Sequence, residues 1–562
     1  DGLKFRSNLG LDARTVQDYE FWSAKTSNRG MGTSYAKNAV DKYTMFTLEN
    51  MLFYDKTFND KHTLGVTLLQ SIQEDKRESV NVAMENLPAD NLKYYDLGSG
   101  LVTNTIGSSM IKWNMASFMG RINYNYLGRY LLTVSARYDG SSRLADGHKW
   151  VLFPSAALAW RINEESFMSS TSGWLDNLKL RLGFGKTGNS AVDPYQTKGT
   201  LSLIRYPFDN GGTPTIGYAP NAMANSLLTW ETTDQWNLGI DFGVLRGRIN
   251  GTIDLYMQNT HDLLLKRQLP VVSGFPDVLS NVGKTRNKGI EVSINSMNIN
   301  SKDFQWTTDL MLSSNKEEIV ELYNGKNDDI GSKWFIGQPV NVHYDYRKVG
   351  IWQNTESDLA EMAKFAANGT EFAPGDIKIQ DVNGDYKITD ADKQILGNPR
   401  PKLIASMVNT FNYKGFDLSV FLYASFGAML YNDIYAVEHC GRNGGVKVDY
   451  WTPNNPTNAY PRPSIDEERP IYITSTYYEK ADFLRVKTMT LGYTLPKTLT
   501  NKFLVEKLRV YFTAQNPFIF TNYTGIDPEA AKVNSAGNPE TNGSGFGTPS
   551  VSSWIFGINL TL

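Results

Sequence analysis

Strict alternation of apolar and polar residues is the feature that most limits how this chain can fold. Near its end, one face of a strand would present Trp554, Phe556, Ile558, Leu560 and Leu562. The same repeat recurs in residues 118–126, 130–139, 236–257 and 508–515. A period of two places neighbouring side chains on opposite faces of an extended strand. The pattern therefore predicts an all-β chain whose strands have one apolar and one polar face.

The spacing of the strands favours a transmembrane antiparallel β-barrel over a large soluble sandwich or propeller. We expect strands of about ten residues, whereas soluble strands average about five or six. Short breaks at Gly128-Arg129 and Lys414-Gly415 alternate with long connections. We place these long connections around residues 13–41, 84–111, 188–228, 317–401, 431–480 and 521–551. Short turns at one rim and long extracellular loops at the other are typical of outer-membrane barrels.

The barrel interpretation also assigns faces and a strand count. We expect Phe118, Ile240, Val510 and Phe512 to face lipid and Thr513 to face inward. About sixteen segments qualify as strands, fewer than the 22 of plugged transporter barrels. Because backbone groups in hydrocarbon must be paired, we expect the first and last of these strands to need further neighbours.

Composition is consistent with this architecture and excludes several classes of protein. The chain is 12% aromatic and only 20% charged, with 47 Gly, which favours strands and turns. A formal charge of −2 provides no electrostatic footprint for nucleic acid, so we expect no nucleic acid as a partner. The barrel interpretation makes outer-membrane lipid an expected partner. The one cysteine, Cys440, excludes a disulfide framework.

We predict that the chain is not an enzyme. Its five histidines, at positions 62, 148, 261, 343 and 439, show no HExxH spacing, and no GxSxG elbow is present. The Gly-Lys-Thr of residues 185–187 lacks the first glycine of a phosphate-binding loop, because position 180 is Leu180.

An acidic segment follows the spacing of a calcium-binding EF-hand loop. Loop positions 1, 3, 5, 9 and 12 hold Asp381, Asn383, Asp385, Thr389 and Asp392, and position 7, where the backbone carbonyl is the ligand, holds Lys387. Two departures are Tyr386 at position 6, where glycine is usual, and the short Asp392 at position 12. We predict a structural calcium site here; the alternative is an Asx-rich turn that binds nothing.

Aromatic residues in the long connections are the candidates for cargo binding. Sugar rings have flat C–H faces that stack on aromatic side chains. We predict substrate binding by Trp334, Phe335, Tyr344, Trp352, Tyr431, Tyr435 and Trp451. The alternative for each residue is that it packs the loops together or contacts another protein.

Several segments resemble the SusC-like (RagA/SusC) family of TonB-dependent outer-membrane transporters. They are residues 130–143, 281–291, 374–378, 397–402, 483–485, 491–496, 515–516 and 523–529. The resemblance implies a 22-stranded barrel in the cell outer membrane of a Gram-negative, Bacteroidetes-type bacterium. It also implies an N-terminal plug, a SusD-like surface lipoprotein that closes over the barrel, and energy from a TonB complex. The implied cargo is oligosaccharides or peptides.

Within that family architecture, we expect residues 1–562 to be the C-terminal part of the barrel, holding roughly the last sixteen strands. The plug, through which the TonB complex would act, and an N-terminal regulatory-like domain are expected to lie outside this sequence. Two other functions stay open. One is a TonB-dependent siderophore or cobalamin receptor, and the other is a non-transporting surface adhesin.

Overall fold

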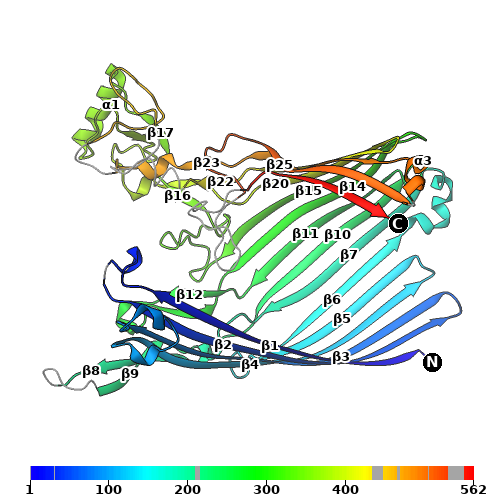
Figure 1. The fold of residues 1–562 in the computed structure, drawn as a ribbon, viewed down its shortest axis with the longest axis horizontal. Coiled ribbons are helices and arrows are strands. Elements are labelled where there is room, and N and C mark those ends of the chain that lie inside the picture. Colours follow the sequence, from blue (N-terminus) through cyan, green and yellow to red (C-terminus); the bar gives the residue numbers. More distant parts are fainter. Residues whose placement is uncertain are drawn as a thin grey trace. The chain divides into compact units, whose positions relative to one another are not determined.

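A single large antiparallel sheet dominates the computed structural model, which describes residues 2–30, 32–208, 215–432, 447–464, 469–503, 505–529 and 550–562. Sixteen strands lie in the sheet in chain order (Figure 1). They are β1 (Leu3–Trp22), β2 (Tyr35–Phe58), β3 (His62–Glu85), β4 (Val102–Tyr126), β5 (Tyr130–Ser141), β6 (Trp150–Arg161), β7 (Leu175–Asn189), β10 (Glu231–Val244), β11 (Ile249–His261), β14 (Lys284–Asn300), β15 (Phe304–Glu321), β20 (Leu403–Tyr413), β21 (Phe416–Phe426), β24 (Phe483–Thr494), β25 (Lys507–Thr521) and β26 (Ser553–Thr561). The predictions of an all-β fold and of about sixteen strands are confirmed.

The chain divides into two compact units, which are described separately. Unit 1 comprises Asp1–Glu164, Leu180–Asn237 and Gln258–Lys284. Unit 2 comprises Glu165–Lys179, Leu238–Met257 and Thr285–Leu562.

Tight turns join neighbouring strands at one end of unit 1. Between β4 and β5, Leu127 and Gly128 both have positive φ, 55° and 70°, and the Arg129 N–H donates to the Tyr126 carbonyl at 3.0 Å. Asn59 and Asp60 form the same kind of turn between β2 and β3, with φ of 51° and 53°. Two successive positive φ angles give the type I′ turn, whose twist matches that of antiparallel strands.

The longer connections of unit 1 lie at the opposite end of its strands (Figure 1). They contain two further hairpins. These are β8 (Thr200–Tyr206) with β9 (Thr215–Ala222), and β12 (Leu264–Gln268) with β13 (Asp277–Asn281).

The strands of unit 1 are longer than predicted. β2, β3 and β4 contain 24, 24 and 25 residues. The prediction that residues 13–41 and 84–111 are loops is wrong for 13–22, 35–41, 84–85 and 102–111, since only 23–34 and 86–101 connect strands there. A tilted strand crosses the hydrocarbon in about nine to eleven residues. The remainder projects into water, where both faces tolerate polar residues and the alternation that marks a strand is lost.

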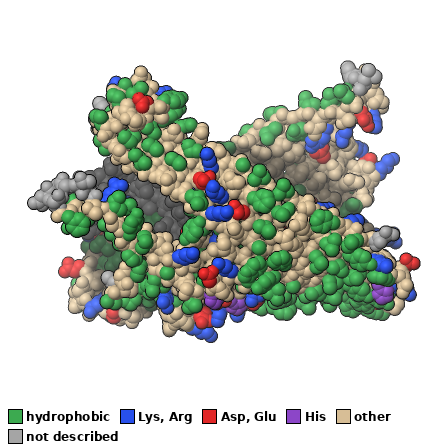
Figure 2. Space-filling view, turned by 90° about the horizontal axis from the view of Figure 1, so that it is seen from below, with side chains coloured by type: hydrophobic (Ala, Val, Ile, Leu, Met, Phe, Trp, Pro, Cys, Tyr) green, Lys and Arg blue, Asp and Glu red, His purple; other side chains and the backbone are tan. Residues whose placement is uncertain are grey.

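Cross-strand register in unit 1 places apolar residues on one face. Phe118 and Ile122 on β4 lie on this exposed face, while Ser117, which directly precedes Phe118, is buried on the other face. In unit 2, Ile240 and Val510 are likewise exposed, and Thr513 is buried. The register also sets Val510 and Phe512 on one face of β25 and Thr513 on the other; which of the two faces meets lipid stays a prediction. Figure 2 shows a continuous area of hydrophobic side chains at the lower right of the view and a group of charged side chains near its centre.

Unit 2 has the same tight turns and one large folded connection. Lys414 and Gly415, with φ of 45° and 91°, join β20 to β21. Between β15 and β20 the chain forms β16 (His343–Asp345), β17 (Lys348–Ile351), α1 (Glu356–Ala367), β18 (Ile377–Ile379) and β19 (Gln394–Gly397). The described part of unit 2 also contains β22 (Met429–Tyr431), β23 (Tyr478–Lys480) and α3 (Lys497–Thr500). None of the helices in the described residues is both long enough and apolar enough to span a membrane.

Candidate functional site in the loops of unit 2

The long loops of unit 2 are folded around hydrophobic cores of their own. One core consists of Ile351, Ile377, Ile379, Trp451, Ile473 and Tyr477. A second joins Trp352 to Met362 and Phe365 on α1. Thr355 caps α1, because its side-chain oxygen accepts a hydrogen bond from the Asp358 N–H. We call residues 317–401, 447–464 and 469–480 the loop region; its cores give it a defined surface.

Three of the predicted cargo-binding aromatics lie inside these loops. Trp352 is fully buried, with its ring centroid 5.9 Å from that of Phe365. Trp451 is buried, and its Nε1–H donates to Oε1 of Gln353 at 2.9 Å. Phe335 is buried as well. Stacking requires an accessible ring face, so in this conformation these three side chains pack the loops.

Three other predicted aromatics keep part of their rings exposed: Trp334, Tyr344 and Tyr431. Tyr344 lies on β16, with its ring centroid 4.8 Å from that of Phe335. Tyr431 ends β22 and contacts Tyr478 at 5.2 Å between centroids. Tyr435 lies outside the described residues. Cargo binding by the whole set stays a prediction, and Trp334, Tyr344 and Tyr431 are the members whose placement suits it.

The predicted calcium loop is a compact turn held by its own acidic side chains. The carboxylate of Asp381 accepts hydrogen bonds from the N–H groups of Gly384 and Tyr386, at 2.7 and 2.8 Å. The buried carboxylate of Asp392 accepts from the N–H groups of Val382 and Thr389, at 2.9 and 2.8 Å. Asn383 and Asp385 are exposed and hydrogen-bonded to each other, and Lys387 donates its N–H to Asp385.

Tyr386 adopts the backbone conformation for which glycine is usual at that position. Its φ is 57°, in the left-handed region. The ring packs 5.5 Å from that of Phe365, and its hydroxyl lies 3.4 Å from Nζ of Lys364. Within the described part of the chain, no three or more His, Cys, Asp or Glu side chains are grouped so that they could hold a metal ion. The calcium site stays a prediction.

Burial perturbs several titratable groups in the loop region, among them Lys348 and Tyr478. Lys348 on β17 donates from Nζ to the Ala459 carbonyl at 2.7 Å, and burial lowers its pKa to about 8. Burial and the neighbouring Asp345 carboxylate raise the pKa of the Tyr478 hydroxyl, which donates to Asp345 Oδ2 at 3.0 Å. The Tyr478 hydroxyl therefore stays protonated and ties β23 to β16.

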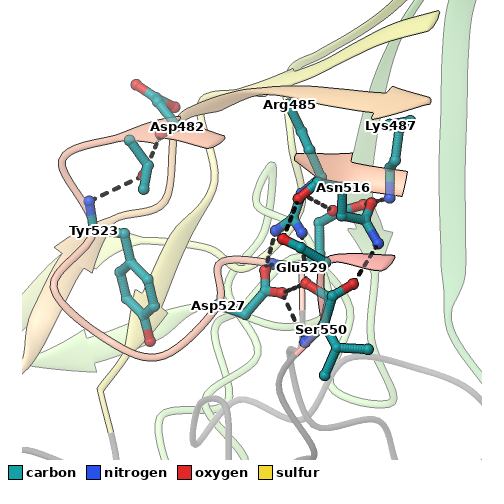
Figure 3. A network of polar contacts seen from close by, with 11 residues as sticks. Asp482, Arg485, Lys487, Asn516, Tyr523, Asp527, Glu529 and Ser550 are labelled. Carbon is teal, nitrogen blue, oxygen red and sulfur yellow. Dashed lines mark hydrogen bonds and ion pairs between the residues drawn. The ribbon is translucent and has the colours of Figure 1, made fainter. Parts of the chain in front are cut away.

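A buried ion-pair network holds the connection that follows β25 (Figure 3). Arg485 on β24 is 4% exposed, and its Nη2 lies 2.5 Å from Oδ1 of Asp527, which is 5% exposed. Its Nε lies 2.6 Å from Oε2 of Glu529, at an angle unsuited to a hydrogen bond. Lys487 reaches the other oxygen of Glu529 at 2.7 Å. Two cations thus face two carboxylates.

Ser550 completes the network. Its hydroxyl contacts both Nη1 of Arg485 and Oδ2 of Asp527. Burial acts to raise the pKa of Asp527, but hydrogen bonds from Ser550 and Glu529 and the charge of Arg485 lower it overall. Asp527 is therefore ionised and fixes the connection to β24. Sequence reasoning singled out residues 483–485 and 523–529 separately, and nothing in their spacing indicated that they meet.

Comparison with known proteins identifies the family. A family described as TonB dependent receptor-like, beta-barrel, matches residues 2–517. This chain belongs to the TonB-dependent receptor β-barrel family. Its members are receptors of the outer membrane and not a class of enzymes.

Several relatives extend this result. TonB-dependent receptor P3 of Formosa agariphila is 32% identical over 580 residues, covering 100% of this chain and 56% of the relative. TonB-dependent receptor SusC of Bacteroides thetaiotaomicron is 35% identical over 434 residues, covering 74% of this chain and 41% of SusC. The resemblance to SusC-like proteins is confirmed, and the chain spans about half the length of such relatives.

The fold is also that of a solved transporter. The structure of the RagAB peptide transporter matches with a TM-score of 0.82 at 22% identity, covering 100% of this chain and 60% of the other. A peptide importer of the same name in the open-open state gives the same TM-score. At this identity the match establishes the shared β-barrel fold.

Proposed function

We propose that this chain is the barrel portion of an active importer of oligosaccharides or peptides across the outer membrane. The observation that supports this most is the 35% identity with SusC over 434 residues. The match to the fold of the RagAB peptide transporter supports peptides as cargo. Oligosaccharides come first because the nearer sequence relative is SusC, and peptides are the second candidate.

Two partners belong to this proposal. A SusD-like surface lipoprotein would close over the long loops, and the folded loop region offers it a defined docking surface. A TonB complex would supply energy through a plug, which the longer relatives have room for. The two hydrophobic cores and the capped helix α1 support the first partner, because a preformed surface binds with less loss of conformational entropy.

Growth of a deletion strain tests the proposal. The gene would be deleted in its native host, and growth measured on oligosaccharides, on peptides, and under iron or cobalamin limitation. Loss of growth on one glycan or peptide source, restored by the intact gene, is expected. A defect confined to iron or cobalamin limitation would instead establish the siderophore or cobalamin receptor. A defect in surface attachment with unchanged growth would establish the adhesin.

The accessible aromatics allow a sharper version of the experiment. Trp334→Ala and Tyr344→Ala should each weaken binding of the cargo by the purified full-length receptor, by about 1–2 kcal/mol if the ring is an energetically important contact. Leu359→Ala, on the exposed side of α1, is the control that leaves these rings in place. Equal affinity in all variants would place the cargo elsewhere.

A further inference from the structure

The loop region of unit 2 contains a cavity of about 640 Å³, within the range of binding pockets for small molecules. The segment that follows α1 forms one side of it, and residues 461–464 and 470–472 form another. In Figure 1, α1 and β17 lie at the end of the unit 2 strands opposite to α3. The long connections of an outer-membrane barrel face the outside of the cell, so molecules that arrive there can reach this cavity.

One wall of the cavity is an ion pair held by the backbone around it. Nε of Arg462 donates to Oδ1 of Asp376 at 2.8 Å, and the other oxygen of Asp376 accepts from the Ala373 N–H at 2.8 Å. The Arg462 N–H donates to the Gly375 carbonyl at 2.8 Å. Gly375 has a φ of 94°, and a Cβ there would lie 2.5 Å from the Trp451 ring and 2.7 Å from Cβ of Arg462. The guanidinium is therefore oriented before any ligand arrives, which lowers the entropy cost of binding.

Aromatic rings form a second wall. Phe372 and Tyr472 line the cavity and are half-buried, with their ring centroids 6.5 Å apart. Phe372 contacts the rings of Trp352 and Phe365, at 5.5 and 5.4 Å between centroids. Tyr472 contacts the ring of Tyr346 at 5.0 Å. A ligand with a flat apolar face can stack on rings that are already fixed in this way.

Several polar groups of the lining are open to a ligand. Within the described residues, the Arg462 side chain forms its ion pair through Nε, which leaves Nη1 and Nη2 as donors. In the same part of the chain, the Glu371 carboxylate and the Thr370 hydroxyl make no hydrogen bond. The cavity thus offers donors, acceptors and an apolar surface together.

The charges of the lining select among classes of ligand. Among the described lining residues, Arg462 is the one cation, and Asp376 and Glu371 are two carboxylates. A sulfated or carboxylated ligand would add a like charge to this net negative set, and an ammonium group would supply no acceptor for the guanidinium. An uncharged sugar avoids both penalties, because each hydroxyl donates and accepts. Neighbouring sugar hydroxyls can meet both Nη groups, whereas successive carbonyls of an extended peptide point to opposite sides.

We propose that this cavity is a binding subsite for a neutral oligosaccharide. A sugar ring stacks on Phe372 and Tyr472. Two neighbouring hydroxyls accept hydrogen bonds from Nη1 and Nη2 of Arg462, and a further hydroxyl donates to Glu371. The subsite rests on the import function proposed above, and its charge restricts the cargo to sugars without sulfate or carboxylate groups.

Two substitutions remove polar contacts of the subsite and should leave the loop region folded. Arg462→Met keeps an apolar stem beside Gly375 and loses the guanidinium. Glu371→Ala removes an exposed side chain. Arg347→Met is the matched control, because Arg347 is an exposed arginine of the same loop region that does not line the cavity. Like Arg462, it is hydrogen-bonded through Nε, in this case to Oε1 of Gln394 at 3.0 Å.

Isothermal titration calorimetry of the purified full-length receptor tests the subsite, with thermal unfolding to verify that each variant folds. The probes are neutral hexasaccharides of glucose, mannose, galactose and xylose, the acidic hexagalacturonate, and an uncharged hexapeptide. We expect a neutral hexasaccharide to bind the parent, with affinity about tenfold lower in Arg462→Met and about threefold lower in Glu371→Ala. Arg347→Met should bind it as the parent does. Hexagalacturonate and the hexapeptide should bind the parent more weakly than that hexasaccharide.

The results that contradict the subsite differ from those that contradict import. Equal affinity for the hexasaccharide in the parent, Arg462→Met and Glu371→Ala would place the sugar elsewhere on a working receptor. Tighter binding of hexagalacturonate or of the hexapeptide, lost in Arg462→Met, would assign the cavity to acidic or peptide cargo. If no probe binds while the deletion strain still fails to grow on a glycan or peptide source, import stands and the cavity is rejected as a subsite. A deletion strain without any growth defect would instead reject the import function.

Discussion

Arg485 shows how one buried charge can fix a long connection. Its guanidinium holds Asp527 and Glu529, and both Arg485 and Asp527 are almost inaccessible to water. Removing one partner of a buried pair leaves the other charge without compensation, at a cost of about 3–5 kcal/mol. We therefore expect Arg485→Ala to destabilise unit 2 by about that amount and to expose residues 522–529 to protease.

The control for Arg485 is its neighbour in the network. Lys487 binds the same Glu529 but is about 29% exposed, so water can replace its charge. Lys487→Ala should cost no more than about 1 kcal/mol. Denaturant unfolding and limited proteolysis measure both variants, and equal losses of stability would show that the network is not buried in solution.

The lowered pKa of Lys348 predicts that the stability of the loop region depends on pH. Its pKa is lowered to about 8, whereas an unfolded lysine titrates near pH 10.4. Between these values the unfolded chain binds more protons, so stability should rise with pH from about 8 to 10.4. The gain should be about 1–2 kcal/mol, discounted because the side chain is partly exposed.

Thermal unfolding at pH 7.5 and pH 10 measures the effect of Lys348. Lys348→Met should remove the rise that this residue causes, while Lys364→Met, on α1, should keep it. A pH profile that is unchanged in Lys348→Met would show that Nζ is hydrated in solution.

At the level of single residues, sequence reasoning succeeded where a rule depends on local geometry. Residues 381–392 form the tight acidic turn that was the alternative to a calcium site, while the calcium site itself stays a prediction. Burial was harder to predict, because Trp352 and Trp451 look like any loop aromatic until α1 and β17 pack over them. The partnership of Arg485 with Asp527 depends on a contact across 42 residues of sequence, which no local pattern encodes.

At the level of strands, two adjacent residues of β4 provide a matched test of the assigned faces. Ile122 lies on the exposed apolar face and Asn123 on the opposite one. Ile122→Arg should destabilise the folded protein in lipid vesicles by about 2–4 kcal/mol, and Asn123→Arg by much less. Urea unfolding in vesicles measures both variants. The same loss in both would mean that the strand does not present one face to hydrocarbon.

The turn of residues 381–392 supports a second test at this level. If calcium binds, it should need six or seven oxygen ligands, and the loop region should melt at higher temperature with calcium than with a chelator. Asp385→Ala should abolish the difference, because it removes a predicted oxygen ligand. The loop region should still fold, because Asp385 is exposed and packs no core. Asp390→Ala is the control, because Asp390 lies in the same turn at a position that is not a predicted ligand. A melting temperature independent of calcium in the parent chain would leave the Asx-rich turn as the correct interpretation.

Strands were predictable where they cross hydrocarbon and not where they leave it. The tight turns at Leu127-Gly128 and Lys414-Gly415 were found within one residue, because positive φ selects a narrow set of residues. The outer part of β4, residues 102–111, was assigned to a loop, since Thr103, Asn104 and Thr105 are consecutive polar residues without alternation. Backbone pairing with β3 keeps that segment extended.

For the whole molecule, the open edge of the sheet predicts that residues 1–562 need further strands to form a closed barrel. The relatives are about twice as long, and β1 is paired along one edge, with β2, in the described residues of unit 1. An unpaired strand edge is not tolerated in hydrocarbon. Residues 1–562 folded alone into detergent should therefore give no heat-modifiable, protease-resistant barrel, whereas the full-length receptor should give one. A closed barrel formed by residues 1–562 without another chain would contradict this expectation.

The length of β2, β3 and β4 affects what the cell displays to its surroundings. At about 3.3 Å per residue, 24 residues extend about 80 Å, and a tilt near 40° leaves about 60 Å along the membrane normal. The hydrocarbon takes up less than half of that height. The rest of each hairpin projects beyond the hydrocarbon, so it presents protein surface that antibodies and bacteriophages outside the cell can contact.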